Sequence, residues 1–159
     1  MPQYRKIFPS YDWDDAWYVN QIVNLPNIVG KEYIGFIKDV PNEEVKSSDA
    51  AIKAWIDLHM TGCSCLILFC GERTHLSKWV KYELELAETR SMGRFIVHLV
   101  GMTSRYGTTC GRGTDPYRYH GMYNADGQGY VIQQYDWVYN DGQRNVSAWI
   151  EDACSRIGR

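Results

Sequence analysis

A nearly unbroken apolar run, Cys63-Ser-Cys-Leu-Ile-Leu-Phe-Cys70, lies between two segments with helical periodicity. Such a run, without polar alternation, is typical of a strand covered on both faces, as in a parallel sheet. Before it, apolar positions recur at helical spacing from Ile52 to His59, behind Ser47 and Ser48, either of which can cap a helix. The centre of the chain therefore predicts a helix followed by a buried strand.

Similar units alternate along the first hundred residues. We expect further strands at residues 6–10, 33–37 and 94–100, and further helices from about 14 to 27 and about 77 to 90. A β-α-β-α-β-α-β series predicts an α/β fold with a doubly wound parallel sheet and right-handed crossovers. The flavodoxin-like strand order is the leading candidate, and it places a ligand site at the carboxyl ends of the strands.

The 159 residues are enough for one domain with a sizeable core. We predict a single domain over residues 1–159, with core βα repeats over 1–100 and an extension over 101–159 that ends in a closing helix. That helix is expected to be capped near Asn145, because apolar positions recur at helical spacing from Val146.

The extension is rich in glycine and tyrosine and shows little periodicity between residues 101 and 141. Tyr119–Asn124 and Tyr130–Tyr139 could pair as a hairpin across the Asp126-Gly127 turn. Because tyrosine favours interfaces, a partner surface or a lid is the preferred interpretation, and an extra layer at the sheet edge is the alternative. Tyr117, Tyr119 and Tyr123 are candidates for such a surface.

Composition excludes several classes of function. The net charge is −2 and basic residues are interleaved with acids, so no nucleic-acid partner is expected. No apolar run approaches the roughly 20 residues that span a bilayer, and no signal peptide is recognisable, so we expect a cytoplasmic protein without a membrane partner. The five cysteines are odd in number and lie largely in an apolar strand, which favours reduced thiols over disulfides or a metal site.

One carboxylate does not fit the helix predicted near residues 77–90. Leu76, Val80, Leu84 and Ala87 fall on one apolar arc, and Glu83 lies inside that arc. A buried carboxylate must be hydrogen-bonded, paired or poised in a cleft, because burial of an isolated charge is costly. A salt bridge to a nearby Lys or Arg and a functional site remain equal alternatives on this pattern alone.

Trp79-Val-Lys-Tyr-Glu83 matches the Trp-x-x-x-Glu pattern of enzymatically active TIR domains. Four further stretches accompany it: Phe8-Pro-Ser-Tyr11, Val19-Asn-Gln-Ile-Val-Asn24, Ser48-Asp-Ala-Ala-Ile-Lys-Ala-Trp-Ile56 and Cys65-Leu-Ile-Leu-Phe-Cys-Gly71. Together they resemble the TIR-like subunit of Thoeris antiphage defence systems over residues 5 to 100. There are two departures from the family. One is Pro9, which we expect at the end of the first strand because proline cannot donate to the ladder, and the other is the loop Lys38-Asp-Val-Pro41, which does not indicate the product.

The resemblance implies NAD as the substrate, with no separate cofactor, and Glu83 as the catalytic residue. Ser10 and Tyr11, at the carboxyl end of the first strand, are then candidates for binding NAD. Phe8 and Trp79 are expected near them. Asp39 and Asp49 are further candidates, although capping and solvation explain acidic loop residues equally well.

As a function, the resemblance implies cleavage of the nicotinamide–ribose bond and a cyclic ADP-ribose-type signal that activates a partner effector. A phage structural protein is expected as the trigger, and self-association through the Asp39 to Glu44 loop is expected to complete the site. The alternative is a non-enzymatic adaptor whose TIR-like surface only assembles with other proteins, because fold alone does not decide function.

Overall fold

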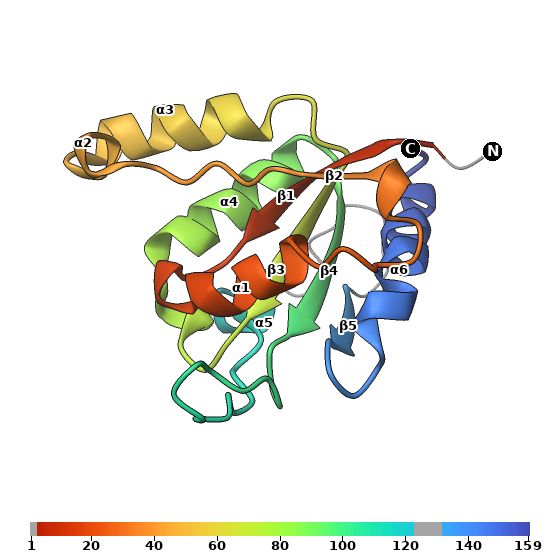
Figure 1. The fold of residues 1–159 in the computed structure, drawn as a ribbon. Coiled ribbons are helices and arrows are strands. Elements are labelled where there is room, and N and C mark those ends of the chain that lie inside the picture. The colour runs from red at the N-terminus through yellow and green to blue at the C-terminus, as the bar shows by residue number, and fades with distance from the viewer. Residues whose placement is uncertain (1–2, 123–131) are drawn as a thin grey trace.

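The computed structural model describes residues 3–122 and 132–159, and these form a parallel sheet with the strand order β2-β1-β3-β4-β5 (Figure 1). The strands are β1 (Arg5–Ser10), β2 (Ile34–Phe36), β3 (Cys65–Cys70), β4 (Gly93–His98) and β5 (Gln133–Asp136). All four strand pairings are parallel. The predicted α/β class and the flavodoxin-like strand order are confirmed.

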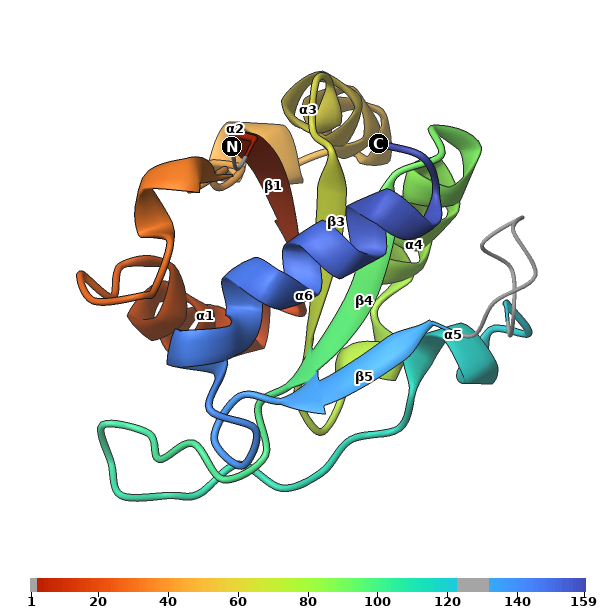
Figure 2. The same cartoon turned by 90° about the vertical axis from the view of Figure 1, so that its right-hand side faces the viewer.

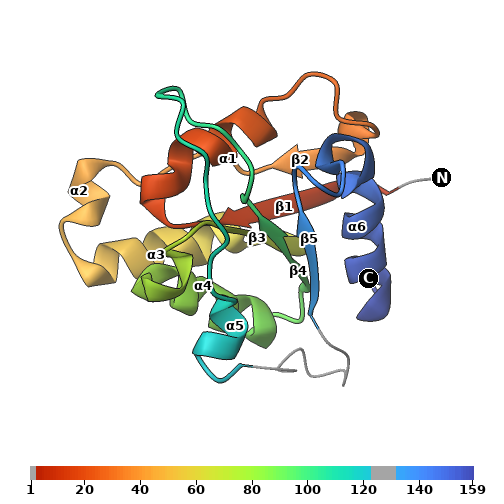
Figure 3. The same cartoon turned by 90° about the horizontal axis from the view of Figure 1, so that it is seen from below.

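Helices cover both faces of the sheet. The longer ones are α1 (Ala16–Val23), α3 (Asp49–Met60), α4 (Lys78–Thr89) and α6 (Gly142–Arg156). The short ones are α2 (Glu43–Lys46), α5 (Pro116–Tyr119) and the 3-10 helices η1 (Trp13–Asp15), η2 (Lys31–Tyr33) and η3 (Thr74–Leu76). Figure 2 shows α6 crossing in front of β3 and β4, and Figure 3 shows α3, α4 and α5 on the other side of the sheet.

The two faces form two apolar cores. One core joins α1 and α6 to the side chains of Ile67, Phe69 and Val97, and the other joins α3 and α4 to those of Leu66 and Leu68. Successive residues of β3 point to opposite cores, and every residue of this strand is buried. The apolar run in the sequence therefore forms the central strand, as predicted.

Local capping explains where α3 and α4 begin. The Ser48 side chain accepts a hydrogen bond from the Ala51 amide, and Ser77 accepts one from the Val80 amide. The first helix is shorter than expected, because it ends at Val23 rather than near residue 27. Pro26 follows, and the residue before a proline disfavours the helical conformation.

Residues beyond 100 contribute to the same sheet. β5 pairs with β4 in parallel, and α6 packs against the sheet from Gly142, three residues before the expected cap at Asn145. Tyr119 ends a short helix instead of beginning a hairpin strand, and the expected turn at Asp126-Gly127 lies outside the described residues.

The tyrosines of this part of the chain do not form one surface. The side chain of Tyr117 is only 1% exposed, whereas Tyr106, Tyr119 and Tyr139 are largely exposed. Tyr123 lies outside the described residues. Because Tyr117 is a core residue, it is not available as part of an interaction surface.

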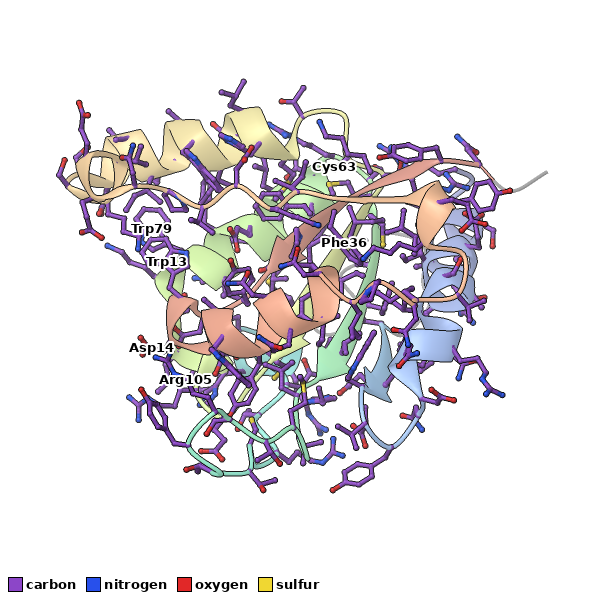
Figure 4. The ribbon with its side chains drawn as sticks, viewed as in Figure 1. Trp13, Asp14, Phe36, Cys63, Trp79 and Arg105 are labelled. Atoms are coloured by element: carbon purple, nitrogen blue, oxygen red, sulfur yellow. The ribbon has the colours of Figure 1, made fainter. Side chains whose placement is uncertain are left out.

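Pro9 lies inside β1 and not at its end, where a residue without an amide hydrogen was expected. The Ile7 carbonyl accepts a hydrogen bond from the Ile37 amide, so residue 7 faces β2. Residue 9 faces the same side, where β2 has already ended at Phe36 (labelled in Figure 4). The missing donor therefore breaks no bond of the β1–β2 ladder.

Over residues 3–122 and 132–159, every helix is too short or too polar to cross a lipid bilayer.

Candidate functional site

A cleft opens at the carboxyl end of β1, on the side of the sheet that α3 and α4 cover. Its empty space, with the solvent at its open mouth included, is about 330 Å³. Its walls come from five segments: β1 with the residue that follows it, the start of η1, the loop after β2, α3 and α4. The lining residues are Phe8, Pro9, Tyr11, Trp13, Ile37, Asp39, Val40, Pro41, Trp55 and Glu83.

Glu83 lies at the base of this cleft and is only 7% exposed. The Ser10 hydroxyl donates a hydrogen bond of 2.8 Å to its Oε1 atom. Within the described part of the chain, no Lys, Arg or His pairs with it, so the salt bridge considered from the sequence is not found there. Burial raises the pKa of Glu83 to about 8, although the Ser10 hydrogen bond opposes this shift.

Aromatic rings form much of the wall above Glu83. Tyr11 faces the carboxyl closely enough that burial and then the Glu83 charge raise the pKa of its hydroxyl. Trp55 contributes from α3, and Trp13, labelled in Figure 4, contributes from the start of η1. Lys46 lies over one face of the Trp13 ring, with Nζ 4.6 Å from the ring centroid. The cleft thus combines apolar rings with a carboxyl group.

The loop after β2 is tied to α3 through a histidine. His59 stacks on Trp55 with ring centroids 4.0 Å apart, and its Nδ1 lies 2.8 Å from the Trp55 carbonyl oxygen. Its Nε2 lies 3.6 Å from the Asp39 carboxylate. This contact holds the loop against the outer wall of the cleft.

The structure brings together four of the six residues expected to bind NAD. Phe8, Tyr11 and Asp39 line the cleft, and Ser10 reaches it only through Glu83. The other two, Asp49 and Trp79, are not among the lining residues. Asp49 starts α3 and forms a 3.0 Å ion pair with Lys78. Trp79 packs edge-on against Tyr82, and the ammonium of Lys78 lies 4.9 Å from its ring centroid.

Comparisons with known proteins identify the family of the chain. A family model described as "Thoeris protein ThsB, TIR-like domain" matches residues 8–103, more than half of the chain. The chain belongs to this family. The match includes all of β1 from Phe8 onward, the loop after β2, and the α4 segment that carries Glu83.

The TIR-like chain is also similar to a protein of Bacillus cereus (strain MSX-D12) named "Putative cyclic ADP-D-ribose synthase ThsB1". The two sequences are 23% identical over 146 residues, a match that covers 66% of this chain and 75% of that protein.

Sequence reasoning missed several cleft residues of the TIR-like domain. The sequence pattern places Trp55 on an apolar helix face and gives Trp13 no role, and Val40 and Pro41 lie in the loop for which only self-association is expected. Helical periodicity shows which side of α3 faces the protein, but not which turn reaches past the core to the sheet edge. The position of Trp55 in α3 could have indicated its place in the cleft, because it lies one turn before His59, which contacts Asp39 in the loop after β2.

A second cleft, of about 510 Å³, lies on the other side of β1. It is lined by Asp12, Asp14, Asp15, Tyr18, Glu72, Arg73, Thr108, Thr109 and Cys110. Here Asp15 accepts a 3.4 Å hydrogen bond from the Thr74 hydroxyl. Burial, followed by the charge of Asp12, raises the pKa of Asp15 to about 6. Acidic side chains, rather than aromatic rings, dominate this wall.

No three metal-ligating side chains come together within residues 3–122 and 132–159. The buried carboxyl group of the first cleft is that of Glu83. When ionised, Glu83 can stabilise a positive charge that develops beside it, and the apolar walls strengthen this interaction by excluding water.

Proposed function

We propose that this TIR-like protein cleaves the nicotinamide–ribose bond of NAD and releases a cyclic ADP-ribose-type signal during antiphage defence. The observation that carries the proposal is the buried Glu83 carboxyl, which no basic side chain neutralises in the described part of the chain and which lines an aromatic cleft. Family membership supports it, as does similarity to the Bacillus cereus protein that is named a putative cyclic ADP-D-ribose synthase.

The proposed reaction places positive charge beside Glu83. As the bond to nicotinamide lengthens, the ribose acquires oxocarbenium character, as in glycoside cleavage. The Glu83 carboxylate stabilises this charge and binds ribose hydroxyls, while a nucleophile within the remaining ADP-ribose closes the ring. Fixed charges aimed at a developing charge in a water-poor site are among the largest catalytic effects.

The walls of the cleft suit the nicotinamide end of NAD. In the oxidised cofactor the nicotinamide ring is cationic, and tryptophan and tyrosine rings attract cations through their faces. Trp13, Trp55 and Tyr11 supply such rings, and Asp39 supplies a second carboxylate. None of the lining residues is Lys or Arg, so the pyrophosphate of NAD is expected to lie outside the cleft.

The cleft is narrow for a dinucleotide, which fits a resting enzyme. Admission of NAD requires the loop after β2 to move away from α3, and the Asp39–His59 contact opposes that movement. We therefore propose that a phage structural protein triggers self-association through residues 39–44. The assembled enzyme then acts on its effector only through the small-molecule signal.

Metabolite analysis tests the proposal against the adaptor alternative. Lysates of infected cells expressing wild type, Glu83→Gln or Glu85→Gln are compared by mass spectrometry. Glu85 lies on the same helix but is exposed and pairs with Lys81, so it is a matched control for loss of a carboxylate. An ADP-ribose derivative is expected in wild type and Glu85→Gln only. Equal amounts in all three samples would remove the catalytic assignment, and none in wild type would favour the adaptor.

A further inference from the structure

The two sides of the Glu83 carboxyl group have different surroundings. Glu83 itself lines the cleft, whereas Ser10 is completely buried behind it and is not among the lining residues. The Ser10 hydroxyl, at the end of β1, donates a hydrogen bond of 2.8 Å to Oε1 of Glu83. The remaining carboxylate oxygen is thereby left for a ligand in the cleft. Ser10 and Glu83 are 73 residues apart in sequence, so the pairing exists only in the fold.

We propose that Ser10 is a positioning residue, which orients the Glu83 carboxylate and favours its ionised form without contacting the substrate. This inference rests on the proposed NAD-cleaving function. It replaces the expectation that Ser10 binds NAD directly, because a completely buried hydroxyl behind the carboxyl cannot reach a ligand in front of it.

The charge on Glu83 depends on this one hydrogen bond more than on any ion pair. Burial raises the pKa of Glu83 to about 8, and the Ser10 hydroxyl is the group that lowers it. A hydrogen bond to a charged group contributes more than one between neutral groups, since it stabilises the ionised form directly. Without the donor, a larger fraction of Glu83 is protonated and inactive near neutral pH.

The other titratable groups around the cleft do not replace Ser10. The Tyr11 hydroxyl donates no hydrogen bond to Glu83 within the described residues, and Asp39 in the loop after β2 is acidic, so neither favours the ionised form of Glu83. His59 of α3 faces Asp39 instead of Glu83. On β3, burial raises the pKa of the Cys70 thiol to about 12, so this group stays neutral.

The test compares wild type with Ser10→Ala, Ser10→Thr and Ser64→Ala. Ser10→Ala removes a single oxygen atom, and Ser10→Thr keeps the hydroxyl on a strand that tolerates a branched side chain. Ser64→Ala removes a hydroxyl just before β3, at the amino ends of the strands and away from the carboxyl end of β1 where Ser10 lies. The first measurement follows the Glu83 carboxyl carbon by NMR during a pH titration, with Glu83→Gln to assign the signal.

We expect the Glu83 titration midpoint to rise by about one pH unit in Ser10→Ala, the shift that loss of a hydrogen bond to a charged group produces. Ser10→Thr and Ser64→Ala should titrate as wild type does. An unchanged midpoint in Ser10→Ala would overturn the proposal.

The second measurement is the pH profile of NAD turnover in the presence of lysate from phage-infected cells. For Ser10→Ala, the acidic limb of kcat should move upward with the NMR midpoint. The rate should fall about tenfold near pH 7 and recover at alkaline pH, with KM unchanged. Equal loss at every pH, or a raised KM, would contradict a positioning role.

The two measurements separate the two ideas. If no variant, wild type included, turns over NAD, the proposed function fails, and with it the catalytic meaning of the pair. The NMR titration still decides whether Ser10 sets the charge of Glu83.

Discussion

Two carboxyl groups on opposite sides of β1 have raised pKa values for different reasons. At Glu83 the pKa rises to about 8 because the group is desolvated among aromatic rings, and one hydroxyl opposes the shift. At Asp15 it rises to about 6 because partial burial is reinforced by the negative charges of Asp12, Asp14 and Glu72. One carboxyl is isolated from charge, and the other is surrounded by like charge.

This difference indicates which cleft suits a reaction that develops positive charge. In the Glu83 cleft, a developing positive charge interacts with one buried carboxylate between apolar walls, where electrostatic interactions are strong. In the Asp15 cleft several exposed carboxylates already attract counter-ions from solvent, which screens each of them. The acidic cleft lies between the ends of β1 and β3, where open sheets often bind ligands, yet its chemistry is less suited to catalysis.

The largest expected effect separates the two carboxyls in activity. Glu83→Gln should lower product formation at least about 100-fold, because it removes the charge aimed at the reacting ribose. Asp15→Asn should stay within a few-fold of wild type. Quantitative mass spectrometry of the product measures both. A larger loss in Asp15→Asn than in Glu83→Gln would place the reaction in the acidic cleft and contradict its assignment to the Glu83 cleft.

The next largest effect concerns thermal stability, because Glu83→Gln should lower activity but raise stability at alkaline pH. The folded-state pKa of Glu83 lies above its ordinary value of 4.5, so its neutral form contributes stability that is complete below about pH 4.5 and lost as the pH rises through about 8. Glu83→Gln should therefore be more stable than wild type at pH 8 by several degrees in Tm, and about equal at pH 4.5.

For Asp15→Asn the gain in stability should be smaller and complete by about pH 6, because the pKa of Asp15 rises only from 3.8 to about 6. Thermal unfolding across pH 4 to 9 measures both variants. A Glu83→Gln protein that is less stable than wild type at pH 8 would show that the carboxylate is paired after all.

Removal of an aromatic ring should change KM for NAD in the Glu83 cleft but not in the acidic cleft. Trp55→Ala removes a ring that faces Glu83, and it should raise KM for NAD about tenfold through the lost cation–π and apolar contacts. Tyr18→Ala removes a ring from the acidic cleft and should leave KM unchanged. Steady-state kinetics measures both. Equal effects would mean that NAD spans the two clefts.

Thiol reactivity should show a smaller contrast. The pKa values of Cys63 and Cys70 are raised to about 11 and about 12, mainly by burial, and Cys65 is fully enclosed. All three should react slowly with a thiol reagent in the native protein. Cys110 lines the acidic cleft and should react before them, although nearby carboxylates also raise its pKa. Rapid modification of all three β3 thiols would indicate that the central strand is exposed.

The smallest effect concerns salt. Added salt screens the charges around Asp15, so 0.5 M NaCl should lower its pKa by a few tenths of a unit. The pKa of Glu83 should not change, because desolvation is insensitive to ions in solution. Carboxyl NMR titrations at low and high salt make the comparison. An equal shift at both sites would contradict the different causes.

The sequence predicted the parts of the fold that repeat a local pattern. The buried β3 run, the capped starts of α3 and α4 and the anomalous Glu83 all follow from periodicity and local chemistry. β5 lies inside Tyr130–Tyr139, which was expected to be one strand of a hairpin, and its parallel pairing with β4 was not predicted. Gln133–Asp136 is short, polar and half-exposed at the sheet edge, so it lacks the apolar pattern that marks the strands of a parallel sheet.

Contacts between distant residues were beyond the sequence pattern. The Ser10–Glu83 hydrogen bond and the Trp55–His59–Asp39 contact depend on strand order and on the angle at which α3 crosses the sheet. Local periodicity indicates neither the strand order nor the crossing angle. The sequence pattern therefore indicates Ser10 as a site residue but does not predict its hydrogen bond to Glu83.

Pro9 has a consequence for the existence of the cleft itself. The next rung between the first two strands would join the amide of residue 9 to the carbonyl of Ile37, and proline has no hydrogen to give. The β1–β2 ladder therefore cannot extend beyond the hydrogen bond from the Ile37 amide to the Ile7 carbonyl, which is where β2 has already ended. Pro9 itself lines the cleft over Glu83, so the cleft lies where the two strands are no longer paired.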